Sequence, residues 1–113
     1  MSVRQAQVKQ DLITHTAPLT RWQGDRGTYH LVVITGDDAE TIAMHARLHR
    51  LEYGTQRGFG SVKVMAQIGD TSWKSSVFPQ ASSTEWILLV SKKVMRAEDL
   101  AAGDPVRVEL ELL

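Results

Sequence analysis

The order of elements in this sequence is repeated, and the repeat constrains the fold more than any other feature. Each copy has an apolar strand, a helix, a glycine turn and an alternating strand, first over residues 29–68 and then over residues 86–112. Val62-Lys63-Val64 in the first copy matches Val106-Arg107-Val108 in the second. A single strand-helix-strand unit cannot bury its apolar face alone. The repeat therefore predicts that the two units pack together as a pseudo-symmetric β barrel.

Two segments before the first glycine turn have clear local signals. Residues 11–23 have the pattern of a long, bent strand, and Pro18 either weakens this prediction or places the strand at an edge of the sheet. Asp37 and Asp38 stand where a helix takes its N-cap and its first-turn negative charge. We therefore expect the main helix over residues 39–53.

The remaining elements follow from apolar periodicity and turn residues. The nearly continuous apolar run at residues 29–34 predicts a strand buried on both faces. Alternation at residues 61–68 predicts a half-buried strand, and Gly69-Asp70 predicts a hairpin turn after it. A short helix is expected over residues 92–100, with Gly103 as the glycine that ends it.

The composition indicates one domain. The chain has 113 residues, of which 42% are hydrophobic and 23% are charged, and this length suffices for a single core. Its 13 basic and 13 acidic side chains give a formal net charge of zero, so no overall field attracts nucleic acid or an anionic membrane. We expect residues 1–10 to be an N-terminal tail and residues 11–113 to be a single β-barrel domain.

Cysteine usage and hydropathy predict the compartment. Cysteine is absent, which excludes a disulfide framework and agrees with a reducing cytoplasm. Residues 1–10 lack the apolar core of a signal peptide, and apolar runs such as residues 86–90 are too short to span a bilayer. These features predict a soluble cytoplasmic protein that does not enter a membrane.

The central part of the chain resembles a known family. The segments at residues 57–64, 68–79 and 88–96, followed by Gly103-Asp104, are similar to the bacterial domain of unknown function 1905 family. The resemblance implies an α+β, mostly β fold: a small double-split β barrel built from two strand-helix-strand repeats, with one main helix. It implies no molecular function. The loop at residues 81–85 departs from the family pattern because it lacks the glycine often found there.

A more distant resemblance concerns residues 89–100 and 103–108. They look like the swapped-hairpin element of the AbrB and MazE regulators, which are DNA-binding dimers. The densest basic cluster of the chain, Lys92, Lys93 and Arg96, lies in this stretch. Either it contacts an anion or nucleic acid, or it is a solvated helical face beside acidic residues. Because a shared fold does not carry a shared function, an AbrB-like DNA-binding regulator is an alternative and not the leading hypothesis.

Four residues are candidates for a ligand site. Arg57 and Phe59 stand at a glycine turn, where backbone N–H groups and a guanidinium can surround an anion. Trp73 and Ser75 face the same side of the following strand, so they can hold a small ligand together if Trp73 lines the mouth of the barrel. The other interpretation is a tight turn that packs Phe59, with Trp73 in the core.

The chemical motifs of common enzymes and metal sites are missing. His45 and His49 have a helical spacing that can hold zinc, but no glutamate stands beside the first, and Arg47 and Arg50 disfavour a cation. The sequence has no nucleophile elbow, phosphate-binding loop or dinucleotide fingerprint. We therefore predict no metal and no cofactor and name no catalytic residue. An enzyme with an unrecognised active site stays a further alternative.

The main helix also predicts a partner surface. Met44, Leu48 and Leu51 form a second apolar stripe on it, and a helix that is apolar on two sides either lies deep or meets a partner. We expect a homodimer through these three residues. The leading hypothesis is an uncharacterised small binding or interaction module that takes an unknown small ligand or protein partner. Nucleic acid is not the expected partner.

Overall fold

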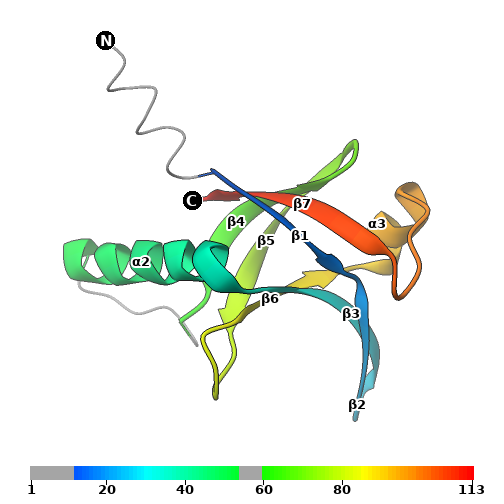
Figure 1. Cartoon of the computed structure of the whole chain (residues 1–113), viewed down its shortest axis with the longest axis horizontal. Helices are drawn as coiled ribbons and strands as arrows, with labels where there is room; N and C mark the ends of the chain where they lie inside the picture. Colours follow the sequence, from blue (N-terminus) through cyan, green and yellow to red (C-terminus); the bar gives the residue numbers. More distant parts are fainter. Residues whose placement is uncertain (1–11, 54–59) are drawn as a thin grey trace.

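In the computed structural model, which describes residues 12–53 and 60–113, seven strands of the described part form one antiparallel sheet. The sheet order is β1-β7-β4-β5-β6-β3-β2, and Figure 1 shows that the sheet curls into a half-barrel with α2 at one side. The elements are β1 Leu12–Pro18, β2 Thr20–Gly24, β3 Gly27–Ile34, α2 Gly36–Tyr53, β4 Val62–Ile68, β5 Thr71–Pro79, β6 Trp86–Val90, α3 Lys92–Ala97 and β7 Pro105–Leu112. The mostly β prediction with one main helix is confirmed. The predicted tail, residues 1–10, lies outside the described residues.

The predicted long, bent strand is in fact two strands that meet at one residue. β1 pairs with β7 and β2 pairs with β3, and only Leu19 separates them. Pro18 ends β1 because it has no N–H to continue a ladder. The buried Leu19 instead donates its N–H to the Asp104 carbonyl and accepts from the Gly103 N–H, both at 2.8 Å. One continuous segment therefore supplies both edges of the sheet, which brings the two edges together and curls it.

The two repeats correspond in space as they do in sequence. The first consists of β3, α2 and β4, and the second of β6, α3 and β7. Equivalent strands pair with each other, β3 with β6 and β4 with β7. Ala66 lies opposite Leu110 in the β4–β7 ladder. Since Val62 and Val106 match in the sequence, Ala66 and Leu110 are also equivalent positions. A pseudo-twofold axis thus passes between these two residues.

The core lies inside the curl. The alternation predicted for residues 61–68 appears in β4, whose inward side chains are buried and whose outward ones face solvent. The α2 helix packs against the same core through Ala39 and Ile42. The sheet residues with the lowest exposure in this core are Val32, Ile34, Val64, Ala66, Val77, Leu88, Val108 and Leu110.

The expected end of the second helix is wrong. The helix ends at Ala97, with Glu98 as its C-cap, and not at Gly103. Asp99 takes the left-handed conformation that a glycine usually supplies, with a φ of 55°. The N–H of Leu100 donates to the Met95 carbonyl at 2.8 Å, which is the longer hydrogen bond of a Schellman motif. This backbone hydrogen bond compensates for an unfavourable φ at an aspartate.

The loop that lacks the family glycine closes without one. Gln80 donates its N–H to the Glu85 carbonyl at 2.9 Å, and the Glu85 N–H donates to the Ser83 hydroxyl at 3.2 Å. Between residues 80 and 85 no residue has a positive φ. The turn geometry of this loop therefore does not require a glycine.

Candidate functional site

A groove opens where β6 ends. The β3–β6 ladder stops at the pair His30–Val90, and the β5–β6 ladder covers only the last residues of β5. Beyond Val90, β3 and β5 therefore face each other with no strand between them. The groove has a volume of about 460 Å³ and is lined by Thr28, Tyr29, His30, Trp73, Ser75, Leu89, Val90, Ser91 and Lys92.

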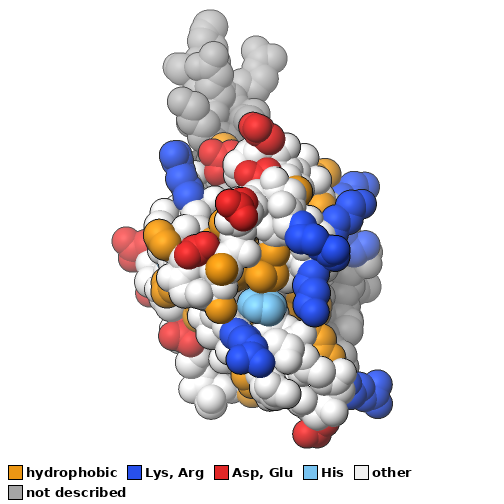
Figure 2. Space-filling model, turned by 90° about the vertical axis from the view of Figure 1, so that its right-hand side faces the viewer, with side chains coloured by type: hydrophobic (Ala, Val, Ile, Leu, Met, Phe, Trp, Pro, Cys, Tyr) orange, Lys and Arg blue, Asp and Glu red, His pale blue; other side chains and the backbone are white. Residues whose placement is uncertain are grey.

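Strand alternation aims several of these side chains into the groove. Trp73 and Ser75 share the face of β5 on which Val77 is fully buried. His30 shares the face of β3 on which Val32 is fully buried. Figure 2 shows the α3 side of the molecule, where a histidine side chain lies among hydrophobic side chains with Lys and Arg side chains around them. The groove thus combines an aromatic wall with polar groups and the cationic side chain of Lys92.

The polar groups of the groove have few partners within the protein. In residues 12–53 and 60–113, no hydrogen bond or ion pair involves the His30 ring, the Trp73 indole N–H or the Lys92 ammonium group. The Ser75 hydroxyl makes one long contact, 3.5 Å to the Ser76 carbonyl. These donors and acceptors are therefore open to a ligand.

The structure places the predicted site residues unequally. Trp73 and Ser75 lie together in the groove, with Lys92 from the predicted basic cluster. Lys93 and Arg96 are exposed on α3 and do not line it. Arg57 and Phe59, the other two predicted ligand contacts, lie outside the described residues.

Sequence reasoning missed His30. The apolar run at residues 29–34 was expected to be buried on both faces, but β3 buries Leu31, Val32 and Ile34 and leaves its first half partly exposed. The alternation of Thr28, His30 and Val32 is the signal that places the imidazole on the inner face.

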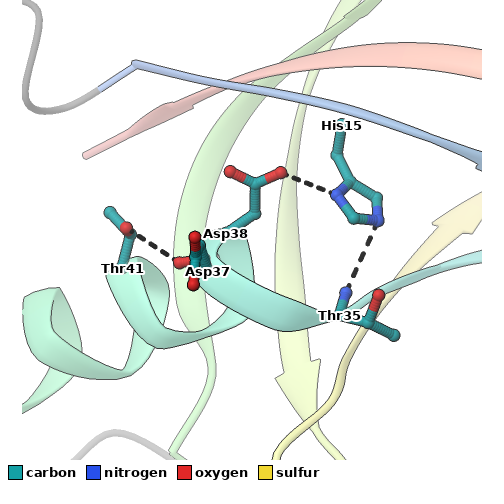
Figure 3. A network of polar contacts seen from close by, with 5 residues as sticks. All are labelled: His15, Thr35, Asp37, Asp38 and Thr41. Carbon is teal, nitrogen blue, oxygen red and sulfur yellow. Dashed lines mark hydrogen bonds and ion pairs between the residues drawn. The ribbon is translucent and has the colours of Figure 1, made fainter.

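A second polar site connects β1 to the start of α2 (Figure 3). The His15 Nδ1 lies 2.7 Å from the Asp38 carboxylate, and the Thr35 N–H donates to the His15 Nε2 at 3.4 Å. Since Nε2 accepts, Nδ1 carries the proton and donates to Asp38. This pair resembles the base and its orienting carboxylate in a hydrolase. Here, however, both ring nitrogens are engaged, so His15 holds β1 against α2.

The outer face of α2 has three exposed apolar side chains and borders a second groove. Met44, Leu48 and Leu51 are 52%, 56% and 75% exposed. Met44 also lines a groove of about 420 Å³ between α2 and the β5–β6 loop, together with Ala39, Glu40, Ala43, Arg47, Pro79, Ser83, Thr84, Glu85 and Trp86. The predicted partner stripe is thus present as an exposed surface.

The two histidines of α2, which have a zinc-like spacing, lie close to each other and to the C-terminal residue. The rings of His45 and His49 are 6.3 Å apart, and the His45 Nε2 lies 3.2 Å from the Leu113 carbonyl. Among the described residues no three His, Cys, Asp or Glu side chains form a group that suits a metal ion.

The chain is thus a small, mostly β protein with a curled antiparallel sheet and one long helix. Its groove beyond the end of β6 is large enough for a small molecule. The chain belongs to the family described as Domain of unknown function (DUF1905), whose model matches residues 15–110. The match covers most of the chain and confirms the resemblance drawn from the sequence. No curated protein matches the chain. Neither helix in the described part of the chain has the length and apolar character needed to cross a membrane.

Proposed function

We propose that this protein is a non-enzymatic binding module that holds a small molecule in the groove between β3, β5 and β6. One observation carries the proposal: His30, Trp73 and Lys92 converge on one hollow and keep their polar groups unpaired within the described residues. A concave site with an aromatic wall and a few convergent polar groups is typical of small-molecule binding.

Binding is favoured over catalysis by the way the histidines are used. The His15–Asp38 pair has the composition of a catalytic dyad, but the Thr35 N–H occupies the nitrogen that would act as a base. His30 has no carboxylate beside it in the groove lining. Among the described residues, the groove does not bring together a nucleophile, a base and a carboxylate that orients the base.

The DNA-binding alternative has less support. Lys92, Lys93 and Arg96 are exposed on a helix of only six residues, and Glu98 and Asp99 follow directly. The formal net charge is zero, whereas phosphate contacts supply most non-specific affinity for DNA. Titration of a labelled duplex at low salt tests this alternative, and salt-sensitive binding that needs all three cations would revive it.

Removing the aromatic wall is expected to weaken ligand binding in the groove. For a fragment that shifts the amide signals of β3 and β5 in a ¹⁵N–¹H spectrum, Trp73→Ala should weaken binding about tenfold or more, because buried aromatic contacts dominate small binding sites. Trp22→Ala is the matched control, since Trp22 is an exposed tryptophan on β2 outside the groove lining. Equal losses in both variants, or fragments that bind elsewhere only, would overturn the proposed function.

We also propose that the α2 stripe pairs with the same stripe of a second copy. Met44, Leu48 and Leu51 have the spacing of alternating core positions in a coiled coil. In a parallel, in-register pair, Arg47 of one copy lies at the flanking position that faces the partner's Glu52. Both charged residues are exposed, so they are free to complement each other across the pair.

Sedimentation equilibrium tests the self-association. Leu48→Glu is expected to shift the chain to monomer, because it places like charges in the seam. Leu89→Glu, the same change at an exposed leucine of β6, should leave the association unchanged. Arg47→Glu should weaken the dimer, and adding Glu52→Arg should restore it. A monomeric wild type at every concentration would contradict the proposal.

A further inference from the structure

The pseudo-twofold axis relates the groove to the His15 site. His15 lies opposite Val108 in the β1–β7 ladder, and Ser75 lies opposite Val64 in the β5–β4 ladder. Val64 and Val108 are the matched residues of the two repeats. Ser75 is therefore the structural equivalent of His15.

The residues that follow the first strand of each repeat also correspond. Val32 lies opposite Leu88 in the middle of the β3–β6 ladder, so these two are equivalent. Counting forward along the chain by equal steps from Val32 and from Leu88 makes Thr35 the equivalent of Ser91. In the same way, Asp38 is the equivalent of Val94. Each repeat thus places one residue of a long strand next to the start of its helix.

In the first repeat the chain itself supplies a carboxylate to this place. Asp38 reaches back from α2 and accepts a hydrogen bond from His15 at 2.7 Å (Figure 3). A hydrogen bond to a carboxylate is stronger than one between neutral groups. The first site is closed by this pair.

In the second repeat the same place has no carboxylate. Val94 is the equivalent of Asp38 in the second repeat, and its side chain is buried in the core. Ser75 is much smaller than His15, and the space that it leaves is part of the groove of about 460 Å³. The groups that line this space include an imidazole, hydroxyls and the Lys92 ammonium group. The first turn of α3 is basic, whereas the first turn of α2 in the other repeat is acidic.

We propose that the ligand of the groove carries a carboxylate, which takes the place that Asp38 holds in the other repeat. This inference rests on the proposed function of the groove and specifies its ligand class. The carboxylate accepts hydrogen bonds from Lys92, His30 and Ser75. Its flat apolar body lies against Trp73 and Val90 of the lining. Small aromatic acids fit both requirements.

The Glu98 carboxylate does not occupy this place. Glu98 accepts a hydrogen bond from the Thr71 hydroxyl at 2.6 Å and lies beside Gly69, at the start of β5. It does not line the groove. Among the described residues no acidic side chain lines the groove, so the Lys92 ammonium group has no carboxylate partner there.

Matched acids and amides test the inference. Benzoate, phenylacetate and indole-3-acetate are titrated into the full chain beside their primary amides, with amide shifts of β3, β5 and β6 as the readout. The acids are expected to bind about tenfold or more tightly than the amides, because a charge-assisted contact to Lys92 is lost in the amide. Lys92→Gln should lower the acid's affinity to that of the amide, whereas Lys93→Gln, at the exposed neighbour outside the groove, should leave it unchanged.

The outcomes separate the two proposals. Acids and amides that bind equally well in the groove would overturn the carboxylate inference and leave the proposed function standing. Neutral fragments that bind there while every acid fails would do the same. If no acid, amide or neutral fragment moves the groove signals, the proposed function itself fails. An equal effect of Lys92→Gln and Lys93→Gln would also overturn the carboxylate inference, because it would reduce the preference to overall charge.

Discussion

Replacing Leu88 with alanine is expected to lower the free energy of unfolding by about 2–5 kcal/mol. Leu88 is fully buried and lies in the middle of β6, opposite Val32 on one side and Val77 on the other. Truncation removes apolar contacts with both neighbouring strands and leaves a cavity that a ladder paired on both sides cannot fill by shifting. Urea denaturation at equilibrium, followed by far-UV circular dichroism, measures the loss.

The neighbouring leucine is the control for this prediction. Leu89 has the same side chain on the same strand but points outward and is 42% exposed, whereas Leu88 is 0% exposed. Leu89→Ala should change the stability by about 0.5 kcal/mol or less, as exposed substitutions do. Similar losses for both variants would mean that the two faces of β6 are not divided into core and surface as the structure has them.

Replacing Gly69 with alanine is expected to cost about 2–4 kcal/mol, the sum of two effects. Gly69 has a φ of 57° at the first position of the two-residue turn that joins β4 and β5, a position suited to glycine. An added Cβ would also collide with the Glu98 carboxylate, whose Cδ is 2.8 Å away. The side chain of Glu98 would then have to move and release its hydrogen bond to Thr71.

A second glycine separates the two effects. Gly103 also has a positive φ, 93°, but nothing lies within 4 Å of an added Cβ. Gly103→Ala should therefore show only the backbone strain, about 1–2 kcal/mol. Thermal unfolding of both variants gives the comparison. If Gly69→Ala lowers the stability no more than Gly103→Ala does, then the Glu98 side chain moves aside without a loss of stability. Its hydrogen bond with Thr71 would then contribute nothing to the free energy of unfolding.

The sheet could be predicted from the sequence because its signals are local. The Gly69-Asp70 turn and the alternation of β4 each depend on a few consecutive residues, and both are confirmed. The end of α3 could not be predicted from the sequence, because the residue with the left-handed conformation there is Asp99 and not a glycine. A backbone hydrogen bond from Leu100 to Met95 supports that conformation, and composition does not reveal it.

The candidate site could be predicted only in part, for the same reason. Trp73 and Ser75 are two residues apart on one strand, so alternation was enough to group them. Lys92 and His30 join them through strand pairing between segments far apart in the chain, which residue types alone do not encode. The contact between His15 and Asp38 likewise spans 23 residues and depends on where β1 meets α2.

The pairing of β1 also sets an order of events during synthesis. Its ladder partner is β7, so residues 12–18 have no strand to pair with until residues 105–112 have left the ribosome. The strands β2 to β6 emerge before that, and the sheet that they form must wait with its β4 edge unpaired. An unpaired strand edge is a template for association with other chains. We therefore expect nascent chains that stall before β7 to be the aggregation-prone species of this protein, and the arrival of the last strand to remove that hazard.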